Sequence, residues 1–122
     1  NQILLLKKYQ KNYKRFDIVV IDDGDEKLIK RIIGLPGETL EVKNNKLYIN
    51  GKYVKEDFEH DKTDDFVYNK KKKIPEGHYF VMGDNRDNSM DSRVFGAFSK
   101  DQIMGVTSFS LFPFQTFGSI EA

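Results

Sequence analysis

The apolar runs of this chain are short, rich in β-branched residues and separated by turn-forming residues. No stretch of about 12 residues places apolar side chains at i, i+3, i+4 and i+7, the spacing that an amphipathic helix needs. Short runs of this kind are typical of strands. We therefore predict a mostly β fold with minor helix, in which the expected strands span residues 3–6, 16–21, 28–35, 39–42, 46–49, 52–54, 78–82 and 102–112.

Turn-forming pairs between these runs predict how the strands connect. Asn44-Asn45 lies between two expected strands and predicts a tight two-residue hairpin, in which asparagine accepts a positive φ. Asn50-Gly51 predicts a second tight turn, and Pro36-Gly37 ends the strand that precedes it. Residues 99–102 predict one short helical turn.

The length of 122 residues indicates a single domain, 1–122, and 39% hydrophobic residues are enough for a packed core. Lysine and arginine (20) nearly balance aspartate and glutamate (19), which argues against nucleic-acid binding, because that function requires a strongly basic face. The absence of cysteine excludes disulfides and thiolate metal sites. Residues 55–73 are polar and charged, and we interpret them as a solvated loop or insertion within the domain.

Lys30 is the first candidate for chemistry. Alternation along a strand places it on one face with Leu28 and Ile32, so either Lys30 or Arg31 must project among apolar side chains. A desolvated lysine can lose its proton near neutral pH, whereas arginine cannot. Lowering a lysine pKa from about 10.4 to about 8 needs roughly 3 kcal/mol of differential desolvation, and the neutral amine is then a general base. Most lysines beside apolar residues instead reach out to water, so the pattern alone leaves both interpretations open.

The second candidate is the polar loop at residues 83–93, which follows an expected strand. Its short side chains can hydrogen-bond to the loop's own backbone and stiffen it. Asp84 with Arg86, and Asp91 with Arg93, place opposite charges close enough to pair within the loop. The loop is either a self-satisfied turn or a rigid support that positions the hydroxyl of Ser89 against a base.

Taken together, these segments resemble the type I signal peptidases, in their short form of the Gram-positive kind. Residues 30–38 (KRIIGLPGE) resemble the lysine-bearing box of that family, and residues 83–86 (GDNR) with 91–93 (DSR) resemble its closing signature. The segments RFDIVV, IPEGHYF, FG and FPF also match in order, so the resemblance runs from residue 3 to residue 114. It implies a single domain of twisted, coiled antiparallel sheets.

The resemblance also implies a function, that of a membrane-bound serine endopeptidase with a Ser/Lys dyad. Such an enzyme removes signal peptides from exported pre-proteins at the cell membrane surface, with its catalytic domain on the extracytoplasmic side and without a cofactor. Lys30 would take the proton of the nucleophilic serine, and Ser89 would hold the Lys30 amine in place. Leu28 and Ile29 would line shallow pockets for small residues at positions −1 and −3. Four charged residues would brace the loop: Asp84, Arg86, Asp91 and Arg93.

The nucleophile of that family lies in a Ser-Met-x-Pro-like segment upstream of the lysine, and no serine precedes Lys30 here. No apolar run approaches the roughly 20 residues of a membrane span. We therefore expect an extracytoplasmic catalytic domain that lacks its N-terminal membrane anchor and its nucleophile segment. The backbone beside the nucleophile also supplies oxyanion stabilisation, worth about 3 to 4 kcal/mol, so we predict that this chain alone is inactive.

Other functions were weighed against this one. A non-catalytic relative would serve as an assembly or chaperone module for surface or pilus proteins, and a self-cleaving repressor-type domain would use the same Ser/Lys chemistry. His60 and His78 lie far apart, which argues against a histidine-based triad or a metal site.

Overall fold

The computed structural model describes residues 5–87, 90–107 and 120–121, the last pair by backbone alone. Helix in this described part is limited to α1 (Ser92–Phe95) and two 3-10 turns, Tyr68–Lys71 and Lys100–Gln102. The predicted mostly β fold with minor helix is confirmed. The strands are β1 (Lys7–Lys8), β2 (Ile18–Asp22), β3 (Lys27–Gly34), β4 (Leu40–Lys43), β5 (Lys46–Ile49), β6 (Lys52–Val54), β7 (Phe66–Val67), β8 (His78–Met82), β9 (Phe98–Ser99), β10 (Ile103–Thr107) and β11 (Ile120–Glu121).

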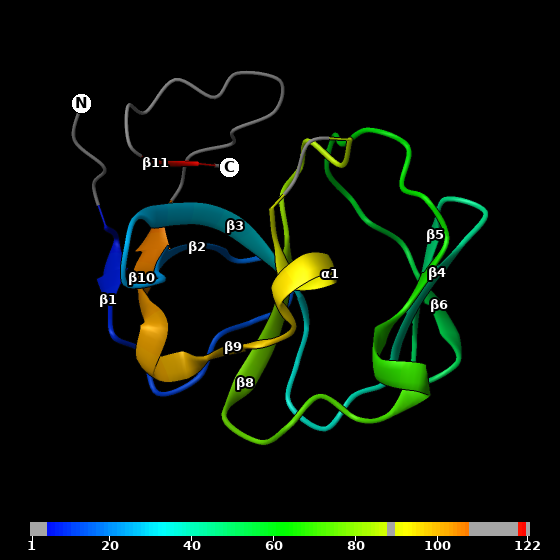
Figure 1. Ribbon diagram of the computed structural model, residues 1–122, viewed down its shortest axis with the longest axis horizontal. Helices are drawn as coiled ribbons and strands as arrows, with labels where there is room; N and C mark the ends of the chain where they lie inside the picture. Colours follow the sequence, from blue (N-terminus) through cyan, green and yellow to red (C-terminus); the bar gives the residue numbers. More distant parts are fainter. Residues whose placement is uncertain (1–4, 88–89, 108–119, 122) are drawn as a thin grey trace.

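These strands form two sheets, and in Figure 1 β1, β10 and β2 lie at one side, β4, β5 and β6 at the other, and β8 and α1 toward the middle. The larger sheet has the order β1-β10-β2-β3-β8-β9, and the smaller one has the order β6-β5-β4-β7. Pairing along both orders is antiparallel. β11 lies off this path and pairs with the start of β3 in parallel. The strands that carry the candidate lysine and precede the polar loop, β3 and β8, are therefore direct neighbours.

β3 and β8 each contribute side chains to two hydrophobic clusters, because successive residues of a strand point to opposite faces. Ile32 and Val81 belong to the cluster within the larger sheet. Ile33 and Phe80 belong to the cluster that joins β3 and β8 to the smaller sheet. Burial on both faces explains why these two strands are continuous apolar runs in the sequence rather than alternating ones.

The tight turns follow the sequence prediction. Asn44 and Asn45 have φ values of 52° and 63°, and they join β4 to β5 in the expected two-residue hairpin. Asn50-Gly51 joins β5 to β6 with positive φ at both positions. Residues 99–102 contain the expected helical turn, and its capping box pairs Ser99 with Gln102.

Some strand predictions need correction. The first strand is Lys7–Lys8 rather than residues 3–6, of which 3 and 4 lie outside the described residues, as do 108–112 of the last expected strand. The interpretation of residues 55–73 as a solvated loop is wrong in part. β7 within this segment pairs with β4, and the side chain of Glu56 has an exposed fraction of only 4%. The segment packs because its few apolar residues, including Phe58 and Phe66, lie against the second cluster.

Candidate active site

Lys30 lies in the middle of β3 and is 2% exposed, which makes it one of the largest buried side chains of the described chain. Its cross-strand neighbour is Val19 of β2, a member of the first hydrophobic cluster, and Leu28 and Ile32 of the same cluster flank it on its own face. The sequence argument offered two positions for burial among apolar side chains, and the structure selects Lys30. An amine in such surroundings is hard to keep charged, because burial in a low dielectric disfavours the ammonium form.

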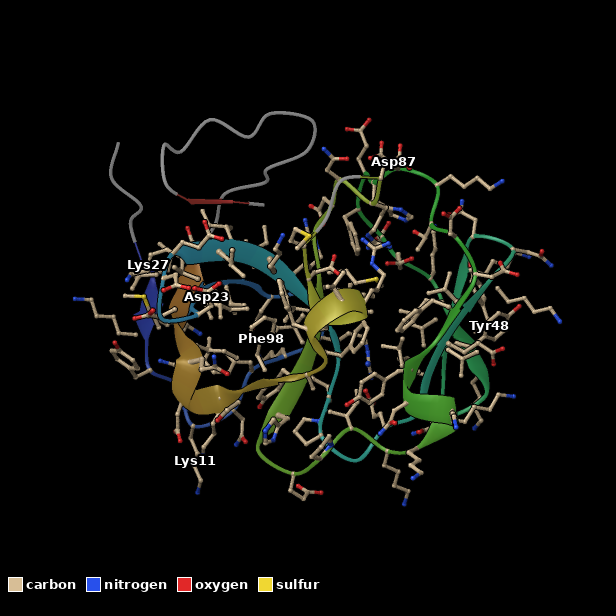
Figure 2. The ribbon with its side chains drawn as sticks, viewed as in Figure 1. Lys11, Asp23, Lys27, Tyr48, Asp87 and Phe98 are labelled. Carbon is tan, nitrogen blue, oxygen red and sulfur yellow. The ribbon has the colours of Figure 1, made fainter. Side chains whose placement is uncertain are left out.

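The loop at residues 83–93 begins opposite Lys30. Pairing between β3 and β8 ends with Arg31 opposite Met82, so the chain leaves β8 at the level of Lys30. Figure 2 labels Asp87, which marks the turn of this loop above β8. The candidate base and the start of the polar loop are thus neighbours by strand register.

Asp84 does not pair with Arg86, as its sequence position had led us to expect. It accepts two hydrogen bonds from Arg31 instead, at 2.9 Å from Nε and 2.7 Å from Nη2. The two side chains have exposed fractions of 6% and 11%. Arg31 alternates with Lys30 and points to the opposite face of β3, where it meets the loop. The prediction from sequence proximity was wrong because the register of β3 and β8 places Arg31 beside Asp84, whereas Arg86 of the loop turns elsewhere.

Arg86 pairs with Glu56 of the polar segment rather than with Asp84. Its Nη2 donates to Glu56 Oε2 at 2.7 Å, and its Nη1 donates to Thr63 Oγ1 at 2.8 Å. Its Nε donates to the Gly83 carbonyl at 2.8 Å, so Arg86 does tie the loop to its own first residue. The sequence held no signal for Glu56, since it is one of several acidic residues in a charged stretch.

Asp91 and Arg93 do pair, as the sequence predicted, at 2.9 Å and 3.0 Å. Asp91 is fully buried and also accepts from the backbone N–H of Gly83 at 3.0 Å, so it closes the loop onto its own start. Asp91 is in addition the N-cap of α1, accepting from the Arg93 backbone N–H. Ser92 Oγ accepts from the Val81 N–H at 2.9 Å and joins α1 to β8. Ser89, the predicted partner of the lysine amine, lies outside the described residues.

Leu28 and Ile29, the predicted substrate contacts, are 1% and 0% exposed. Ile29 packs with Val20 on the face opposite Lys30. The backbone edge beside them is occupied by β11, which pairs in parallel with Lys27 and Leu28. This edge of β3 therefore accepts an extended strand two residues before Lys30.

In the described part of the chain, no three histidine or acidic side chains are grouped as a metal site would require. His60 faces Glu56 across 3.5 Å, whereas His78 lies beside the carbonyl of Glu76 at 2.9 Å. None of the described helices has the length and apolar character of a membrane span.

A family profile, two curated relatives and a crystal structure that match this chain are all described as signal peptidases. The profile of the family described as signal peptidase, peptidase S26, matches residues 1–112. The chain is 49% identical over 121 residues to signal peptidase I S of Bacillus subtilis and 48% identical over 123 residues to signal peptidase I of Bacillus amyloliquefaciens. These alignments cover 88% of this chain but only 64% and 63% of the relatives. A crystal structure of a signal peptidase I from Enterococcus faecalis matches with a TM-score of 0.70 and 37% identity, over 80% of this chain and 98% of that one.

Proposed function

Because this chain belongs to the signal peptidase family, peptidase S26, we propose that it is the catalytic domain of a serine endopeptidase that removes signal peptides from exported pre-proteins. The domain would act on the extracytoplasmic side, at the surface of the cell membrane. The observation that carries the proposal is the burial of Lys30 among apolar side chains, at the level where the polar loop leaves β8.

In this proposal Lys30 is the general base. It would remove the proton of a serine hydroxyl supplied from upstream of this chain, as that serine attacks the scissile carbonyl, and would return the proton to the leaving amine. A base of this kind must be neutral before it acts, and the apolar surroundings of Lys30 favour the neutral amine. Ser89 would orient the amine, while Asp84, Arg86, Asp91 and Arg93 would hold the loop that carries it.

The substrate would bind as an extended strand beside β3, with small residues at −1 and −3 near Leu28 and Ile29. Parallel pairing of β11 with Lys27 and Leu28 supports this mode of binding, because it uses the same backbone donors and acceptors that a peptide would use. The side chains of Leu28 and Ile29 are buried at present. A peptide would therefore reach them only after displacing the atoms that cover them.

Two variants of the full-length gene product test the proposal. Lys30→Met should abolish cleavage of a signal-peptide substrate, because it removes the base and keeps the apolar packing. Lys46→Met, which changes an exposed lysine of β5 on the smaller sheet, should leave cleavage unchanged. Cleavage that survives Lys30→Met would refute the role of Lys30.

The 122-residue chain by itself should neither cleave the substrate nor take label from a serine-directed acylating inhibitor. The reason is that no serine precedes Lys30 at the nucleophile position. Turnover by this chain would contradict the assignment of the nucleophile to an upstream segment. The residue at that upstream position also separates the enzyme from the non-catalytic assembly module, since only the enzyme requires a serine there.

A further inference from the structure

Residues 56–63 pack around loop 83–93 and are not used by the chemistry proposed above. The carboxylate of Glu56 lies against Arg86, whose side chain has no exposed surface, at 2.7 Å. The Asp61 N–H donates to the Asp84 carbonyl at 3.3 Å. Thr63, which accepts from Arg86, is itself held by Asn45 of the β4–β5 hairpin at 2.8 Å. The smaller sheet is thereby connected to the loop through hydrogen bonds, of which the one between Arg86 and Thr63 is buried.

Phe58 contacts both guanidinium groups that hold this loop. Its ring centroid is 4.0 Å from Cζ of Arg31 and 5.7 Å from Cζ of Arg86, and both distances fall within the range of cation–π contacts. Two guanidinium groups that share one aromatic ring bring like charges to the same site. Asp84 neutralises Arg31, and Glu56 neutralises Arg86. The stack fixes the orientation of both arginines at once.

This cluster is linked to Lys30 through the backbone of β3. Arg31 follows Lys30 directly, and Asp84 is the second residue of the loop that leaves β8 opposite Lys30. A shift of residues 83–86 would therefore move the backbone that faces Lys30 across the sheet. Productive geometry tolerates only about 0.5 Å of such movement.

We propose that Glu56 and Phe58 are positioning residues, which hold the first part of the loop, residues 83–87, against β3 and thereby keep the surroundings of the Lys30 amine dry. The consequence for catalysis rests on the proposed function, but the positioning itself is a property of the folded chain. Residues 56–63 of the polar segment are then a buttress for the candidate site, whereas most of residues 64–73 are exposed.

The test uses the 122-residue chain and NMR detection of the Lys30 Cε resonance as a function of pH. In wild type the Lys30 titration midpoint should lie well below about 10.4. Glu56→Gln and Phe58→Leu should each raise this midpoint by about one pH unit, because a looser loop admits water. Hydrogen exchange of the Val81 and Gly83 amides, which bond to Ser92 and Asp91, should accelerate about tenfold in the same variants.

Glu59→Gln is the matched control, since Glu59 is an exposed acid of the same segment, and it should change neither measurement. Phe58→Leu leaves every ion pair intact, so it remains informative if Glu56→Gln unfolds the protein. Variants that lose thermal stability but keep the wild-type Lys30 midpoint would overturn the positioning role. A wild-type midpoint at the ordinary lysine value would overturn the proposed base instead, and the exchange rates would still decide whether Glu56 and Phe58 hold the loop.

Discussion

Replacement of Asp84 by alanine should be among the most destabilising single changes in the described chain. The substitution removes two short hydrogen bonds to Arg31, at 2.9 Å and 2.7 Å, and leaves that guanidinium largely shielded from water. Among the described residues, Arg31 keeps the Phe16 carbonyl, at 3.1 Å, and the Phe58 ring. Removing one partner of a buried ion pair typically costs about 3–5 kcal/mol.

The expected change in melting temperature follows from chain length. An unfolding entropy of about 2.1 cal/mol/K per residue makes a loss of 3 kcal/mol equivalent to a fall of about 12 °C for a chain of 122 residues. Urea denaturation of Asp84→Ala, Arg31→Met and the double variant, each followed by circular dichroism, measures both the single costs and their coupling. The double variant should lose less than the sum of the two singles by about 2 kcal/mol, because it leaves no unpaired buried charge.

Asp22→Ala is the control for this prediction, because Asp22 pairs with Lys27 on the surface at 3.5 Å with side chains 46% and 41% exposed. Its melting temperature should stay close to that of wild type. If Asp84→Ala were no more destabilising than Asp22→Ala, or if the Arg31 and Asp84 costs were additive, the buried pair would not be what holds the loop to β3.

Three further predictions concern the core, a cap and alkaline pH. Gly34→Ala should cost about 1–3 kcal/mol in urea denaturation, because a Cβ there would lie under 3.0 Å from side-chain carbons of Ile74 and Leu40. Ser99→Ala should cost about 1 kcal/mol by thermal melting, because Ser99 Oγ accepts from the Asp101 N–H at the start of a 3-10 turn. Burial raises the pKa of the Tyr13 hydroxyl above its ordinary value of about 10. The stability that this group contributes is present below pH 10 and is lost as pH rises toward the folded-state pKa, so Tyr13→Phe should unfold less steeply with pH above 10.

The sequence by itself determined most of the strands and the tight turns. The apolar runs are too short and lack the i, i+3, i+4, i+7 spacing of an amphipathic helix, and Asn44-Asn45 and Asn50-Gly51 accept the positive φ that two-residue hairpins require. It also determined that either Lys30 or Arg31 would be buried among apolar residues, since alternation along β3 leaves no other arrangement. These are local properties of the chain, fixed by the backbone preferences of neighbouring residues.

Only the tertiary structure decided which charges meet. Arg31 and Asp84 are far apart in sequence and pair because β3 and β8 are adjacent in the larger sheet. Arg86 pairs with Glu56, which belongs to a segment that the sequence predicts to be solvated. An ion pair depends on distance in space and on the exclusion of water, and spacing along the chain specifies neither. For the same reason, the sequence did not predict that Phe58 contacts two arginines.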